Sequence, residues 1–182
     1  MVVRSCFFIL MLFTFSLYGQ NVNAPASSSI KANFTMASVK AYQESATLKI
    51  EDYYQYLTLL SSEATSETLK IEIKSSIYSL FDDDKVKVID FTSSENPDIL
   101  LSKLIEKIEG KNYTFSVLNF ENSIIGSDYW TTKYQLIVTQ NKIPVEFNYF
   151  QKIGFKPIVK NFGTTKKEVW TLFLGEVTLP QL

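Results

Sequence analysis

The sequence predicts an α+β domain in which N-terminal helices pack on a curved, cone-like antiparallel sheet of three or four long strands. Apolar residues recur at three- and four-residue steps in the first half of the chain, which is typical of helices. In the second half, apolar and polar residues alternate, which is typical of strands with one buried face. Because the helices come first and the long strands follow, the order favours α+β over a parallel α/β arrangement.

Two helices are expected in the first half of the chain. Apolar residues from Val39 to Leu60 share one face of a long helix, which Ser61 and Ser62 end. After a polar break, a second helix carries apolar residues over 69–81 and ends at an acidic run. Each helix is expected to bury its apolar face against the sheet.

A short strand and a third helix are expected next. Residues 85–91 alternate and are rich in β-branched side chains, which favours a strand. Asn96 is expected to cap the third helix, with Pro97 at its first position. Gly110 is expected to end that helix, since glycine readily adopts the left-handed conformation found at helix ends.

The remaining chain is expected to form the long strands. Alternating residues predict strands around 113–117, 130–138 and 145–149. A longer break is expected at 156–167, which contains a proline and a glycine. The last run, 168–175, is apolar on both faces, so it is expected to be a central strand.

The N-terminus predicts export. Arg4 precedes an apolar run at 6–18, whose 13 residues would rise only about 20 Å as a helix, against a bilayer core of about 30 Å. A charged start followed by a short apolar run and small residues is typical of a secretory signal peptide, here 1–19. Cleavage after Gly19 is favoured, and cleavage after Ala26 is the alternative.

The leader also defines the expected domains and compartment. Residues 20–36 are predicted to be a flexible N-terminal segment, and 37–182 a single α+β domain. The protein is expected to be periplasmic or extracellular, and its Lys-, Asn- and Ile-rich composition is typical of AT-rich bacteria. Cys6 lies too near the start to be a lipid-anchored first residue, so a lipoprotein is not expected.

Missing residue types exclude several chemistries. The chain has no histidine, and its only cysteine and arginine are Cys6 and Arg4, both in the leader. The mature chain therefore lacks the side chains for nitrogen- or sulfur-ligated metals, for histidine or cysteine catalysis, and for disulfides, and no metal or cofactor is expected. Its near-zero net charge predicts no nucleic-acid binding, and no stable membrane span is expected after cleavage.

Four stretches carry a resemblance to a known family: Ile50–Leu57, Ile77–Phe81, Val86–Ile89 with the helix after it, and the aromatic strands from Tyr113 to Leu174. Their order resembles the nuclear transport factor two-like superfamily, the cystatin-like cone, and in particular its extracytoplasmic bacterial members of unassigned role. The resemblance implies a deep pocket between sheet and helices, frequent dimers, and roles from isomerases and dehydratases to non-catalytic binding modules. Catalytic members commonly use an Asp–His pair or acidic residues there. Since this chain has no histidine, no catalytic residue is assigned.

Aromatic residues are the candidate ligand-binding residues. They could line a pocket for an apolar or sugar ligand. The alternative, which is favoured, is that they pack the sheet against the helices. These candidates are Tyr53, Trp130, Tyr134, Phe147, Tyr149 and Trp170.

Five lysines lie near the last predicted hairpin, between Lys152 and Lys167. Such spread lysines are typical of a solvated loop or a guarded strand edge, and steering of an acidic partner is the alternative.

The sequence favours an exported, non-catalytic binding or interaction module of the bacterial envelope. Its partner would be an envelope protein or a small apolar ligand, and a homodimer is left open. Two alternatives remain: a small-ligand carrier, or a pocket enzyme of isomerase or hydrolase type that uses only carboxylates, tyrosine and lysine.

Overall fold

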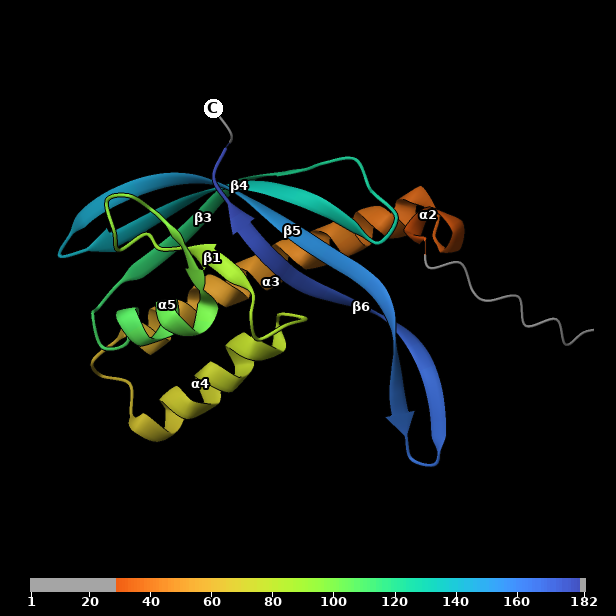
Figure 1. Ribbon diagram of the computed structural model, residues 1–182, viewed down its shortest axis with the longest axis horizontal. Helices are drawn as coiled ribbons and strands as arrows, with labels where there is room; N and C mark the ends of the chain where they lie inside the picture. The colour runs from red at the N-terminus through yellow and green to blue at the C-terminus, as the bar shows by residue number, and fades with distance from the viewer. Residues whose placement is uncertain (1–28, 181–182) are drawn as a thin grey trace, which may run out of the picture.

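Helices fill the concave side of a four-stranded antiparallel sheet in the computed structural model, which describes residues 29–180 (Figure 1). The predicted α+β class, with N-terminal helices against an antiparallel sheet that has long strands, is confirmed. No helix within the described residues is both long and apolar enough to cross a membrane. The elements before the sheet are α2 (Ile30–Asn33), α3 (Met36–Ser61), α4 (Glu67–Ser79), β1 (Lys87–Ile89), β2 (Asp98–Leu100) and α5 (Leu101–Ile108).

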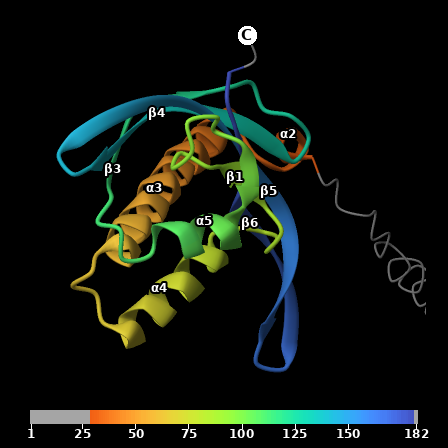
Figure 2. The same cartoon turned by 60° about the vertical axis from the view of Figure 1, so that its left-hand side comes forward.

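The sheet is a simple meander in which each strand pairs with the next. Its order is β3 (Thr114–Asn122), β4 (Tyr129–Gln140), β5 (Ile143–Phe162) and β6 (Thr165–Thr178). Register shifts interrupt the β3–β4 ladder after Leu118 and the β5–β6 ladder after Gln151. Such irregularities increase local twist and bending. The sheet curls around α3 (Figure 2).

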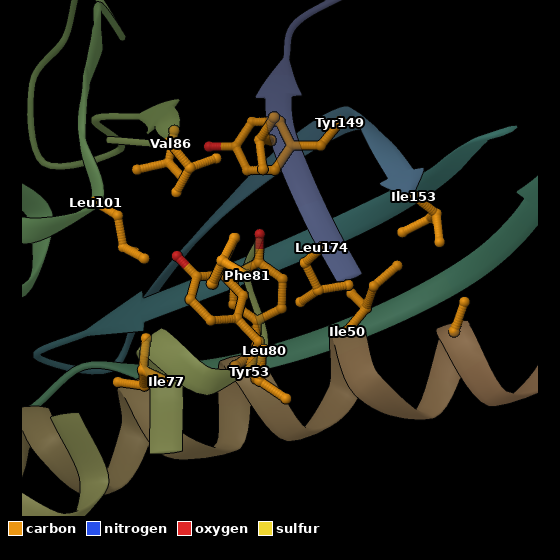
Figure 3. Close-up of a cluster of buried hydrophobic side chains, with 14 of the residues drawn as sticks. Ile50, Tyr53, Ile77, Leu80, Phe81, Val86, Leu101, Tyr149, Ile153 and Leu174 are labelled. Carbon is orange, nitrogen blue, oxygen red and sulfur yellow. The ribbon is translucent and has the colours of Figure 1, made fainter. Parts of the chain in front are cut away.

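The long helix α3 forms the centre of the core, as its periodicity predicts. Thr35 caps it, because its hydroxyl oxygen accepts a hydrogen bond of 3.2 Å from the Ser38 N–H. Ser66 caps α4 in the same way through the Leu69 N–H. Figure 3 shows this core, with Ile50 and Tyr53 from α3, Ile77, Leu80 and Phe81 from α4 and the residues after it, Tyr149 and Ile153 from β5, and Leu174 from β6.

The predicted start of the third helix is wrong. Residues Asp98–Leu100 form strand β2, in which Ile99 pairs with Val88, and α5 begins only at Leu101. Asn96 has a φ of 48° and lies in the turn before β2 rather than at a helix cap. The pairing between β1 and β2 overrides the local capping signal. The predicted end is confirmed, since Gly110 follows α5 with a φ of 65°.

The long break expected at 156–167 is also wrong. β5 and β6 stay paired from Lys156 opposite Thr171 to Phe162 opposite Thr165, so only a tight turn containing Gly163 interrupts them. Pro157 is tolerated because β4 pairing ends at Gly154, and β5 beyond that point has one free edge.

The last strand is not central, contrary to expectation. β6 lies at the edge of the sheet, after β5. Part of its outer edge is covered by the chain that follows α4, where the Leu174 N–H donates to the Leu80 carbonyl at 2.8 Å. This cover explains an apolar pattern that otherwise indicates a strand between two neighbours.

The predicted leader lies outside the described residues, as does most of the segment 20–36. The end of that segment contains α2, in which Ile30 is fully buried. The Ile30 N–H donates to the Ser127 carbonyl at 2.7 Å, so this end is joined to the loop before β4.

Candidate functional site

The six aromatic residues predicted from the sequence all lie in the interior, between α3 and the sheet. Four of them are buried, and the other two, Phe147 and Trp170, are partly buried and pack against the core. Whether they bind a ligand stays a prediction, and their contacts divide them into two groups.

The first group is a tyrosine cluster between α3, β4 and β5. The Tyr134 and Tyr149 rings lie side by side across the two strands, with centroids 6.0 Å apart. Tyr149 stacks on Phe147 at 5.6 Å, and Tyr54 lies 4.8 Å from Tyr53 and 5.9 Å from Tyr134. These rings pack on one another.

The second group surrounds Phe155 at the other end of α3. Its ring centroid is 6.2 Å from that of Trp130 and 5.1 Å from that of Trp170. Phe34 packs edge-on against Trp170 at 5.0 Å. The chain after α2 therefore closes this group with an aromatic side chain of its own.

A line of hydrogen bonds crosses the tyrosine cluster. The Tyr134 hydroxyl donates to Gln151 Oε1 at 3.2 Å and lies 2.9 Å from the Tyr54 hydroxyl. Since the Tyr134 hydrogen is used on Gln151, the Tyr54 hydroxyl is the donor of that second bond. Burial is the main cause that raises the pKa of both tyrosines. The hydroxyl of Tyr149 is buried and has no hydrogen-bond partner within residues 29–180.

Two members of this line, Tyr54 and Gln151, were not predicted as site residues. Tyr54 follows Ile50 by four residues and precedes Leu57 by three, so the helical period could have placed it on the buried face. Gln151 is polar, but it is two residues from both Tyr149 and Ile153, so the two-residue period of the strand could have placed it on the buried face.

A buried carboxylate lies beside the same cluster. Asp90, just after β1, forms an ion pair with Lys107 of α5 and accepts bonds from the Thr92 N–H at 3.1 Å and hydroxyl at 2.6 Å. Burial raises the pKa of Asp90, but the bonds from Lys107 and Thr92 outweigh it and hold the pKa below its ordinary value. The carboxylate is therefore ionised near neutral pH and joins the loop after β1 to α5.

Replacing Lys107 by methionine is expected to lower the free energy of unfolding by about 1–2 kcal/mol, because it leaves the buried Asp90 carboxylate without its ammonium partner. The matched control on the same helix is Lys103→Met, which removes an exposed i,i+3 pair with Glu106 and is expected to cost less than about 0.5 kcal/mol. Urea unfolding followed by circular dichroism measures both. Equal losses in the two variants would show that Asp90 needs no partner.

The first part of β5 has an open backbone edge. β6 pairs with β5 only from Phe150 onward, so residues Ile143–Tyr149 pair with β4 on one side alone. We call Ile143–Tyr149 the β5 edge. Within the part of the chain that the structure describes, no backbone hydrogen bond joins its free side to another element. In an antiparallel strand, every second residue directs its N–H and C=O to that free side.

Apolar side chains lie along one face of the β5 edge. Ile143 and Val145 are 67% and 50% exposed, and Phe147 is partly buried. They lie on the concave face, because Val145 and Phe147 pair with the buried Val138 and Leu136 of β4. The edge therefore offers free backbone groups beside an exposed apolar surface.

The opposite face of the β5 edge is polar. Pro144, Glu146 and Asn148 alternate with the apolar residues. A Glu146 carboxylate oxygen accepts a hydrogen bond of 2.9 Å from Gln135 on β4. A partner strand on this edge would meet an acidic group on one side and aliphatic groups on the other.

A separate groove of about 410 Å³ lies over β4–β6, beside the chain after α4. Two of its three lysines already have partners: Lys156 Nζ lies 2.5 Å from Asp82, and Lys152 Nζ lies 4.6 Å from the Tyr129 ring centre. Since two of the three lysines are engaged in this way, fewer cationic groups are left to bind a ligand in the groove.

Comparison with known proteins adds no family to this description: no protein-family model matches the chain, and no curated protein matches it. The fold defines the class, an α+β domain with N-terminal helices packed against a four-stranded antiparallel sheet.

Proposed function

We propose that this chain is an exported, non-catalytic interaction module of the bacterial envelope, whose β5 edge pairs with an extended segment of a partner protein. The β5 edge is the observation that carries the proposal. Export and the envelope location rest on the leader sequence 1–19. Membership of the nuclear transport factor two-like superfamily is part of the proposal and rests on the order of helices and strands.

Strand addition fits the chemistry of this edge. A segment laid along it would satisfy the free N–H and C=O groups and cover the side chains of Ile143 and Val145. An unpaired edge with exposed apolar residues is otherwise an aggregation hazard that proteins tend to cover. Opposite Glu146, a partner with Lys or Arg would gain a cross-strand charge pair. The expected partner segment therefore alternates apolar residues with basic or polar ones.

The interior favours an interaction module over the two alternatives. A small-ligand carrier needs space among the aromatic rings, and here Tyr134, Tyr149 and Phe147 contact one another. A pocket enzyme needs a carboxylate that is free to contact a substrate, and the buried Asp90 carboxylate is already bound by Lys107 and Thr92. The packed aromatic rings do not resemble a prepared ligand-binding site, and the ion-paired Asp90 does not resemble a prepared catalytic site.

Site-specific photo-cross-linking tests this proposal. A benzophenone side chain placed at Val145 in the native cell is expected to give a discrete adduct, because that position faces the bound segment. The matched control is Ile71, which is 69% exposed and lies on helix α4 rather than on a strand. An adduct of twice the chain mass would identify the partner as a second copy. No adduct at Val145 above that at Ile71 would contradict the proposal.

The complex identified in this way permits a second measurement. Val145→Lys is expected to weaken binding by about ten-fold, since it removes a buried aliphatic contact and adds a charge to the edge. Ile71→Lys introduces the same charge and should leave the affinity unchanged. Equal affinities of the two variants would place the partner elsewhere.

A further inference from the structure

A hairpin formed by the end of β5 and the start of β6 extends beyond the body of the protein (Figure 1). We call residues 157–170 the arm. Every side chain from Val159 to Glu168 is exposed, and the tip turns at Gly163, which has a φ of 63°. Trp170, at the base of the arm, packs against the core, but none of the residues from Val159 to Glu168 belongs to it. The pattern of those exposed residues is therefore not explained by core packing.

Three lysines lie in the outer half of the arm. Lys160 and Lys167 are direct cross-strand partners, and Lys166 is one residue nearer the tip. Like charges directly opposite one another destabilise a strand pair. Within residues 29–180, no ion pair includes any of these three, whereas Lys156, just before the arm, pairs with Asp82. The arm thus presents an uncompensated cationic pair.

An exposed aromatic ring lies at the tip. Phe162 is 54% exposed and precedes the turn. By strand alternation it shares a face with Lys160 and Lys167, and with Ile158 at the base. Along this face the order from base to tip is aliphatic, cationic, aromatic. An aromatic ring beyond a pair of lysines is the depth order found at a membrane–water interface.

We propose that the arm docks on an anionic lipid surface. The Phe162 ring enters the boundary between headgroups and acyl chains, while Lys160, Lys166 and Lys167 contact headgroup phosphates. Opposite residues in an antiparallel pair lie about 5 Å apart, so two ammonium groups can reach one phosphate. This local cationic surface is not apparent from the net charge of the whole chain, which is −1.

The shape of the arm favours a lipid surface over an acidic protein as its binding partner. A narrow tip that extends beyond the body can reach a flat surface, and its outermost large side chain is apolar rather than charged. An acidic protein partner would leave Phe162 without a complementary environment unless it also offered an apolar pocket. The inference does not depend on the proposed function, because the β5 edge lies at the other end of the same strand.

Vesicle flotation tests the docking. The chain from Gln20 onward is used, because it contains the whole described core and lacks the apolar leader, which would bind lipid itself. At low salt it is expected to float with vesicles of phosphatidylglycerol and phosphatidylcholine, and not with phosphatidylcholine alone. Lys160→Gln with Lys167→Gln is expected to weaken binding by about 25-fold, at about five-fold per lysine.

Matched variants make the result specific to the arm. Lys40→Gln with Lys87→Gln removes the same charge from exposed sites on α3 and β1 and should leave binding within about two-fold of the unchanged chain. The chain already contains Trp130 and Trp170, so the emission at position 162 is taken as the difference between Phe162→Trp and the unchanged chain, and this difference is expected to shift to the blue on anionic vesicles only. The arm variant should melt no lower than the unchanged chain, since it removes a repulsive pair.

Three results would overturn the proposal. These are absence of binding to the anionic vesicles at low salt, equal weakening by the arm and control variants, and an unshifted Phe162→Trp emission on vesicles that bind the chain. Binding to polyglutamate that exceeds binding to the vesicles would instead assign the arm to an acidic protein.

Discussion

Alkaline pH is expected to unfold this protein cooperatively, beginning just above pH 10. Burial is the main cause that raises the pKa of Tyr53, Tyr54, Tyr134 and Tyr149 above the ordinary value of 10.0. Above pH 10 the unfolded chain loses these protons while the folded chain keeps them, so the free energy of unfolding falls as pH rises. Below pH 10 both states are protonated, and this contribution is fully present.

The expected loss of unfolding free energy is large enough to unfold the domain. Above pH 10, each buried tyrosine lowers the free energy of unfolding by about 1.4 kcal/mol per pH unit. The four tyrosines together therefore lower it by roughly 5 kcal/mol per pH unit. A domain of this size is stable by about 5–15 kcal/mol. The fold should therefore be lost within about one to three units above pH 10.

Circular dichroism and tyrosinate absorbance, recorded together against pH, check this expectation. The buried tyrosines should ionise in the same transition in which the secondary structure is lost. A gradual ionisation of every tyrosine near pH 10, with an unchanged dichroism spectrum, would show that the cluster is accessible to hydroxide.

Two neighbouring tyrosines are expected to respond oppositely to loss of the hydroxyl. Tyr134→Phe should lower the free energy of unfolding by about 2 kcal/mol, because it leaves the Tyr54 hydroxyl and Gln151 Oε1 buried without their partner. Tyr149→Phe should be neutral or stabilise by up to about 1 kcal/mol, because its buried hydroxyl has no partner within the described chain.

These variants are well matched. Tyr134 and Tyr149 are paired in register on adjacent strands and are both buried, so the change in apolar volume is the same. Urea unfolding measures the two free energies. A loss at Tyr149 as large as that at Tyr134 would mean that the Tyr149 hydroxyl is bonded in solution. Tyr149→Phe should also move the alkaline transition to higher pH, since one titrating group is removed.

The fold class could be predicted because its signals are long. The helix at Met36–Ser61 repeats its apolar period over several turns, and alternation marks the strands. Two predictions that rested on one or two residues were wrong. Asn96 and Pro97 resemble a helix start, yet the segment after them pairs with β1, because long-range pairing is absent from a local pattern. Pro157 resembles a break, yet it lies where β5 has a free edge.

The candidate site was less predictable for a related reason. The aromatic residues could be selected by type, but their grouping depends on the register between β4 and β5. The β5 edge exists because Thr178, the end of β6, pairs with Phe150 and leaves the residues before it uncovered. No local property of Ile143 or Val145 shows where a strand far along the chain stops.

The length of β5 has a consequence for geometry. Its 20 residues run unbroken from Ile143 to Phe162, and the strand is paired along its whole length, first with β4 and then with β6. From Val145 to Phe162 the backbone spans at most about 55 Å. Since both ladders overlap around Gln151, there is no unpaired hinge between the two ends. If both proposals hold, a partner on the β5 edge is expected to be held at a fixed distance from the surface that the arm touches, and the strand would then act as a spacer between them.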